Sequence, residues 1–292
     1  MREGDTARGR GGEEGLQSRS GLSPFLIAAY VILSLWALWA LLPLFWMFST
    51  SFKEVRAAIK IPPEWLPTHP TFVNYQVLFA RAPVFRWLLN SGIVAVAHTI
   101  SMLLFCSMAG YAFAKKDFPG KNAMFWSLLS TMMIPGTVLL VPLFLLVSRM
   151  GLINNFGGLI LPGLVGAFGV FLMKQFMQTL PGELLDAARI DGASELGVYS
   201  RVVLPLSKPA LAVLGIFSFI GAWNDFLWPL LITQSKMMRT LAVGLATLQQ
   251  ESMTDYNLLM AGSAVAAIPM IIVFFACQKH FLKGLTIGAL KG

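Results

Sequence analysis

Charged residues are scarce in this chain, and apolar residues are abundant. Of its 292 residues, 12% are charged and 56% are hydrophobic, and the mean hydropathy is +0.69. Soluble globular domains carry about 25% charged residues. The composition therefore excludes an ordinary soluble domain and indicates an integral membrane protein.

Cysteine is also scarce, and the patterns of common catalytic and metal sites are missing. Cys106 and Cys277 lie in apolar runs without metal-ligand or CxxC spacing, so we interpret them as packing residues. The sequence has no HExxH and no GxSxG motif. Its nearest match to a phosphate-binding loop has Lys115 where the motif needs glycine and Asn122 where it needs serine or threonine. We predict no enzyme activity and no metal or cofactor bound by this chain.

A concentrated basic face is missing as well, although the net charge is +8 and the pI is about 9.7. The lysines and arginines are spread along the ends of loops, which does not indicate a nucleic-acid partner. They are more frequent in the segments on the side of the two termini, and cytoplasmic loops carry such an excess. The sequence predicts that the N and C termini are cytoplasmic.

Six apolar runs are long enough to be spans, because a helix needs about 20 mainly apolar residues to cross a bilayer. We therefore predict an all-α membrane protein with six transmembrane helices. The predicted spans are Phe25–Met47, Leu88–Ala114, Ala123–Val147, Phe156–Met173, Ala210–Leu231 and Leu258–Cys277.

The remaining segments are predicted to lie outside the bilayer. Residues 1–23 are rich in glycine and charge and are predicted to be a disordered cytoplasmic segment. Residues 24–292 then form the transmembrane domain, which ends in a cytoplasmic tail over 278–292. The outer loop, residues 51–87, contains a proline-rich stretch typical of extended backbone. This loop is either a surface cover or part of a landing surface for an external partner.

A long hydrophilic segment, residues 179–209, separates spans four and five on the predicted cytoplasmic side. Pro181 can start a helix, Glu183 favours its N-terminal end and Gly192 allows a turn after it. A second short helix is predicted over Ser194–Val203, and it runs into Pro205. Since a few residues would join two spans, this ordered segment indicates a docking surface for a partner outside the membrane. Its first helix places Leu184, Ala187, Ala188 and Asp191 on one face.

Proline and glycine interrupt spans three and four. Such residues are tolerated where neighbouring protein satisfies the freed backbone groups, so we predict that these spans pack against other spans. The residues are Pro135, Gly136 and Pro142 in span three, and Pro162, Gly163, Gly166 and Gly169 in span four.

Two ionisable side chains lie within the spans, and we predict that Asp225 faces the protein interior because a carboxylate is costly at mid-membrane. Trp223, Asn224, Asp225 and Trp228 together offer flat apolar faces and hydrogen-bonding groups that suit a polyhydroxylated solute. The alternative is that Trp228 anchors the span at the interface and that Asn224 and Asp225 cap backbone broken by Pro229. For His98 we favour structural hydrogen bonding within the bundle.

The hydrophilic segment resembles the signature loop of binding-protein-dependent ABC importer permeases. The motif stands here as Asp186-Ala187-Ala188, three residues, Gly192, and then Val202 and Leu204-Pro205. The stretch Ala222–Pro229, the pair Asn74-Tyr75, the segment Phe118–Gly120 and the tail Gly284–Gly292 are similar to the shorter, six-span subunit of maltose-type carbohydrate permeases.

This resemblance implies a permease subunit in a prokaryotic inner membrane that imports a sugar or oligosaccharide by alternating access. It implies two ATPase subunits, which hold ATP and magnesium, a second related permease and an external solute-binding protein. Asp186 replaces the usual glutamate of the motif, so the expected ion pair to the ATPase is looser or uses Glu183. The tail is expected to reach toward the ATPase dimer interface. The residues expected to form the coupling helices between spans four and five are Glu183, Asp186, Ala187, Ala188, Asp191, Gly192, Leu204 and Pro205.

Other readings of the sequence remain open. A secondary transporter driven by an ion gradient would need several ion-coupling groups near the midplane. A membrane scaffold would explain the spans but not the ordered hydrophilic segment. An importer of the same family could carry glycerol-phosphate or another polar solute.

Overall fold

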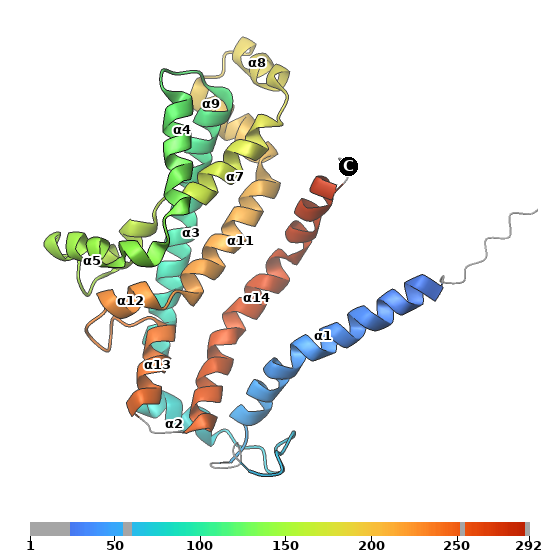
Figure 1. Cartoon of the computed structure of the whole chain (residues 1–292), viewed down its shortest axis with the longest axis vertical. Helices are drawn as coiled ribbons and strands as arrows, with labels where there is room; N and C mark the ends of the chain where they lie inside the picture. The colour runs from blue at the N-terminus through green and yellow to red at the C-terminus, as the bar shows by residue number, and fades with distance from the viewer. Residues whose placement is uncertain (1–23, 55–59, 252–254, 290–292) are drawn as a thin grey trace, which may run out of the picture. The chain divides into compact units, whose positions relative to one another are not determined.

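The computed structural model describes residues 24–54, 60–251 and 255–289, and within these ranges the regular elements are helices without strands (Figure 1). The all-α prediction is confirmed. The predicted disordered segment 1–23 lies outside the described residues. The chain divides into two units, Met1–Trp46 and Met47–Gly292, which are described separately.

Among the described residues, three helices are long and apolar enough to cross a membrane, and up to six spans result if three bent helix pairs each count as one. The single helices are α1 (Pro24–Ser51), α3 (Val84–Lys115) and α14 (Tyr256–Ala289), whose first part, Tyr256–Gln278, meets the test. The prediction of six spans agrees with the upper count. The backbone of α14 continues as far as Ala289, into the segment predicted as a tail.

Span three differs most from a simple crossing. Its two halves, α4 (Lys121–Ser130) and α5 (Leu140–Arg149), belong to segments bent by 94° relative to each other, with short 3-10 helices η2 (Thr131–Met133) and η3 (Gly136–Leu139) between them. The break lies at Ile134, which is extended, because a residue before proline disfavours the helical region.

Spans four and five are broken as well. In span four, α6 (Phe156–Ile160) and η4 (Leu161–Gly163) meet α7 (Ala167–Gln178) at an angle of 43°. Span five was predicted as Ala210–Leu231, but helix α11 (Lys208–Asn224) stops one residue before Asp225, and a short helix α12 (Leu227–Ile232) follows. Asp225 has extended backbone at this break.

A row of glycines lets α3 and span four approach closely. An added Cβ would lie 2.6 Å from His98 Cδ2 at Gly163, 3.0 Å from Met102 Cε at Gly166 and 2.7 Å from Cys106 Sγ at Gly169. These three partners recur every four residues on α3, which places them on one face. The glycines of span four, from which we predicted an interruption, therefore also lie at the contact with α3.

The close contact between α3 and span four predicts that one added methyl group at Gly110 lowers the stability of the protein. A Cβ there would lie 2.6 Å from Met173 Cβ and 3.0 Å from the backbone nitrogen of Lys174. Since backbone cannot move aside easily, Gly110→Ala should destabilise the protein by about 1–3 kcal/mol. Thermal unfolding in detergent measures this. The control is Gly92→Ala on the same helix, where nothing lies within 4 Å of the added atom; equal unfolding temperatures for the two variants would refute the close packing.

The end of α3 that begins at Val84 is held by loops and short helices. Trp87 Nε1 donates to the carbonyl of Lys236 at 2.7 Å, and Asn90 Nδ2 donates to that of Met237 at 2.8 Å. These bonds fix the connection between α12 and α13 (Leu241–Glu251). The predicted outer loop is irregular over residues 60–72 and then forms α2 (Val73–Arg81).

Two buried asparagines secure the start of that loop. Asn74 Nδ2, from α2, donates to the carbonyls of Ser51 and Lys53 at 2.8 and 2.7 Å. Asn257 Nδ2, from α14, donates to the carbonyls of Lys53 and Glu54, both at 2.9 Å. The chain leaving α1 is therefore pinned by two separate elements.

Candidate functional site

The first helix of the hydrophilic segment, α8 (Gly182–Ile190), forms where the sequence predicts it. Pro181 is its N-cap residue and Glu183 lies in its first turn. At its end Gly192 adopts φ +83°, a left-handed conformation that favours glycine. The amides of Gly192 and Ala193 donate to the carbonyls of Arg189 and Ala188, each at 3.0 Å. This Schellman motif ends the helix and sets the direction of the chain that follows.

The second helix continues further than predicted. Ser194 caps α9 (Glu195–Val198), its Oγ accepting the amide of Gly197 at 3.2 Å. A π-helix, η5 (Tyr199–Val203), and α10 (Leu204–Leu206) follow without a break. Pro205 does not stop the helix, since the helical backbone continues through it to Leu206. A bend of 78° then separates Glu195–Leu206 from α11.

Figure 1 shows α8 and α9 beside the C-terminal end of α3, at the opposite end of that helix from α2 and α13. Within Gly182–Ile190 a single side chain, Leu185, is buried, and it joins a core cluster with Met177, Val198 and Tyr199. Ala188 packs against the same cluster, and the other residues of α8 are exposed. Of the residues predicted for coupling, Ala188 and Leu204 are half-buried, whereas Glu183, Asp186, Ala187, Asp191, Gly192 and Pro205 are exposed.

Several large apolar side chains around this segment are exposed too. Ile190 is 87% exposed, Leu196 69% and Leu184 46%. These residues belong to the hydrophilic segment 179–209 and not to a predicted span. Exposed apolar groups rimmed by polar ones are typical of a protein interaction surface.

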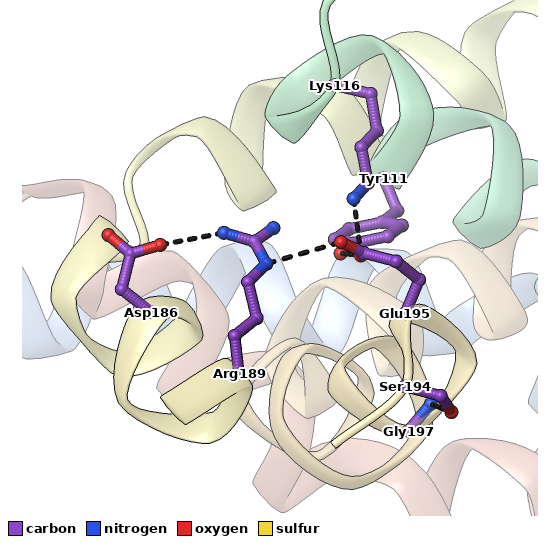
Figure 2. Close-up of polar contacts among 7 residues, drawn as sticks. All are labelled: Tyr111, Lys116, Asp186, Arg189, Ser194, Glu195 and Gly197. Carbon is purple, nitrogen blue, oxygen red and sulfur yellow. Dashed lines mark hydrogen bonds and ion pairs between the residues drawn. The ribbon is translucent and has the colours of Figure 1, made fainter. Parts of the chain in front are cut away.

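An ion-pair network ties the segment to α3 (Figure 2). Arg189 Nη1 contacts Asp186 Oδ1 at 2.7 Å, and Arg189 Nε contacts Glu195 Oε1 at 3.2 Å. On its other side, Glu195 forms an ion pair with Lys116, and Tyr111 donates its hydroxyl to Glu195 Oε2 at 3.1 Å. The Lys116 ammonium, together with the Tyr111 hydroxyl, holds the pKa of the Glu195 carboxyl below its usual value.

Sequence analysis did not single out Glu195, Lys116 or Tyr111. The contact between Asp186 and Arg189 has a local signal, because opposite charges three residues apart on a helix are neighbours. The link from Glu195 to Lys116 has none, since spans three and four separate these residues in the sequence. Within Gly182–Ile190, Asp186 is paired with Arg189 while Glu183 forms no ion pair.

The four residues of the predicted pathway divide into two kinds. Trp223 and Trp228 are buried, and each indole N–H binds a carbonyl: Trp223 that of Ala266 at 3.3 Å and Trp228 that of Gly158 at 2.9 Å. Trp228 therefore links α12 to α6, and its side chain is buried. Asn224 is exposed and Asp225 half-buried at the break in span five.

The surroundings of Asp225 explain the short helix that follows it. Its carboxylate lies near the backbone amides of Trp228 and Phe226 and interacts electrostatically with them and with His98. The His98 ring packs against Gly163, and its Nδ1 is buried without a hydrogen-bond partner among the described residues. Asp225 is thus a half-buried polar group at the break, next to the first amides of α12.

The outer loop carries a polar cavity of about 220 Å³. A Lys60–Glu64 ion pair of 2.7 Å lies beside it, and Thr68 Oγ1 donates to Glu64 Oε1 at 3.1 Å. The lining residues are Lys53, Glu54, Lys60, Glu64, Thr68 and His69, with Pro67.

Comparison with known proteins decides the family. Residues 102–287 match the family described as "Binding-protein-dependent transport system inner membrane component". The chain belongs to this family. Like other inner membrane components of binding-protein-dependent systems, it is a permease subunit of an ABC importer, a transport component with several membrane helices. The predicted family, fold class and location in a prokaryotic inner membrane are confirmed.

Relatives of this inner membrane component cover nearly its whole length. The arabinooligosaccharides transport system permease protein AraQ of Bacillus subtilis is 38% identical over 92% of this chain and 97% of that protein. The sn-glycerol-3-phosphate transport system permease protein UgpE of Salmonella typhi is 33% identical over 92% and 98%. The diacetylchitobiose uptake system permease protein NgcG of Streptomyces coelicolor is 30% identical over 91% and 89%.

A solved structure shares the fold. It is the crystal structure of a bacterial ABC transporter involved in the import of the acidic polysaccharide alginate. One chain of it matches this inner membrane component with a TM-score of 0.78 and 26% identity, over 88% of this chain and 96% of that chain.

Proposed function

We propose that this permease imports a sugar or oligosaccharide and is driven by ATP hydrolysis on separate subunits. The observation that carries the proposal is α8, an ordered helix that is anchored by the buried Leu185 and the half-buried Ala188 and is otherwise exposed. Such a surface suits a partner that binds from the aqueous side. The named substrates of AraQ and NgcG are oligosaccharides, which supports a carbohydrate as solute.

The proposed assembly contains two ATPase subunits that hold ATP and magnesium, a second related permease and an external solute-binding protein. Here α8 and α9 face the cytoplasm, and Glu183, Asp186, Ala187, Ala188, Asp191 and Gly192 form the ATPase-facing surface together with Leu204 and Pro205. Closure of the ATPase subunits on ATP displaces α8, and the spans rock between outward-open and inward-open arrangements. The polar cavity of the outer loop supports a landing surface for the binding protein on the opposite side.

The solute path is proposed to run past the break in span five. Asn224 is exposed there and Asp225 is half-buried, so these two side chains can contact a polyhydroxylated solute. Trp223 and Trp228 are proposed to hold the neighbouring helices together through their indole hydrogen bonds. The predicted spans contain no lysine or arginine. Recognition of a phosphate usually uses such groups, so this half of the path favours a neutral sugar over glycerol-phosphate.

A transporter driven by an ion gradient is the second candidate. In the predicted spans, His98 is the basic residue and Asp225 is the acidic residue. Secondary transporters generally place several coupling groups in repeated halves near the midplane. The pair His98 and Asp225 is a weak basis for that mechanism.

Reconstituted uptake separates the two candidates. Proteoliposomes that contain this chain, its second permease and the ATPase are given labelled arabinotriose, diacetylchitobiose or sn-glycerol 3-phosphate, with the binding protein outside. We expect accumulation of one of the two sugars that requires both ATP and the binding protein. Accumulation by this chain alone on a sodium or proton gradient would contradict the proposal.

A further inference from the structure

We propose that Glu195 is a positioning residue that joins α8 and α9 to α3, so that the three helices move together. This inference rests on the proposed function, because it concerns how the movement of α8 reaches the spans. It names the contacts through which a movement of α8 would reach the membrane domain.

Glu195 is shared between two elements. One carboxylate oxygen, Oε1, contacts Arg189 of α8 at 3.2 Å, and the other, Oε2, contacts Lys116 and accepts the Tyr111 hydroxyl. By contrast, the pairs Asp186–Arg189, Asp117–Lys121 and Lys60–Glu64 each join residues three or four positions apart. In this network Glu195 is therefore the group that bridges distant parts of the chain (Figure 2).

A second contact repeats the connection one turn along α3. The Tyr199 hydroxyl lies 2.7 Å from Ser107 Oγ in a hydrogen bond, and the Tyr111 and Tyr199 rings pack with centroids 5.5 Å apart. Because Ser107 and Tyr111 are four residues apart, they share a face of α3. This face therefore holds both α9 and η5.

The same end of α3 also holds the chain that enters α8. Lys115 Nζ donates to the carbonyl of Leu180 at 2.6 Å, just before the N-cap Pro181. The end of α3 thus contacts the segments on both sides of α8. Displacement of α8 is therefore transmitted to α3, which packs against the glycines of span four.

The exposure of this network argues against a role in folding alone. The side chains of Glu195 and Lys116 are 54% and 32% exposed. Exposed ion pairs add little to stability. Loss of the Glu195 charge should therefore leave the fold intact while it loosens the joint.

The test compares ATP hydrolysis by the reconstituted complex with and without its solute-binding protein. For Glu195→Gln we expect the ATPase subunits to co-purify in the normal ratio, while stimulation by the binding protein falls about fivefold, the lower end of typical coupling between sites. Lys116→Gln should have the same effect. The double variant should be no worse than Glu195→Gln, because both substitutions break the same ion pair between Glu195 and the end of α3.

Asp117→Asn is the matched control, since it removes an exposed ion pair of 3.2 Å to Lys121 that does not involve α8 or α9. Its stimulation should equal that of the unaltered complex. Normal stimulation of Glu195→Gln, effects of the two substitutions that multiply, or loss of the ATPase subunits from Glu195→Gln would each overturn the inference. An unaltered complex without any stimulation would instead contradict the proposed function.

Discussion

Replacement of Gly192 by proline is expected to abolish ATP-dependent uptake while the chain still inserts into the membrane. Proline fixes φ near −65°, whereas Gly192 has φ +83°, and proline also lacks the amide that binds the carbonyl of Arg189. The Schellman motif would be lost and α8 would be released from its orientation. If coupling between α8 and the spans is worth about 3 kcal/mol, uptake falls about 100-fold. Uptake of labelled sugar into proteoliposomes measures this.

Gly151 provides a matched control for that substitution. It follows α5 with φ +69°, and its amide binds the carbonyl of Ser148 at 3.0 Å, as that of Gly192 binds Arg189. Gly151→Pro therefore creates the same backbone conflict away from α8. We expect it to lower thermal stability as much as Gly192→Pro but to retain most uptake. Equal loss of uptake in both variants would show that α8 has no special role.

Asp225→Ala is expected to have the second largest effect, a reduction of uptake without loss of ATPase association. The carboxylate is half-buried at the break in span five and interacts electrostatically with His98. A hydrogen bond from a solute hydroxyl to such a charged group contributes about 1.5–3 kcal/mol. If this contribution is used in the transport cycle, uptake should fall at least about tenfold.

Asp255→Ala separates a local capping role from a role in the solute path. Asp255 Oδ1 accepts the amide of Leu258 at 3.3 Å and so caps the start of α14, at the end of a span. This variant loses a comparable cap but should transport normally. A normal uptake rate for Asp225→Ala would assign that carboxylate to backbone capping alone.

Local signals in the sequence were sufficient for the segment that we propose as the docking surface. Pro181 and Gly192 mark the ends of α8 within two residues, and the reason is that both act on their own backbone. The apolar runs located the spans for the same reason. Hydropathy reports the environment of each helix without any knowledge of its neighbours.

Contacts between distant residues were beyond the reach of the sequence. The proline in span three predicted an interruption but not the bend of 94°, which depends on the surrounding helices. Helix α11 ends at Asn224 and α12 begins at Leu227 within span five, and the hydropathy of the run hides this break. The bridge from Glu195 to Lys116 exists only once α9 lies against the end of α3.

The account depends on one claim, that α8 binds a separate ATPase subunit. Photo-crosslinking from Ile190, which is 87% exposed on α8, tests it most directly. With a photoreactive amino acid at this position, we expect a covalent adduct to the ATPase subunit in the assembled complex. The same group at Leu66, 68% exposed in the outer loop, should give none. Absence of the adduct at Ile190, with and without ATP, in a complex that imports its sugar would contradict the account.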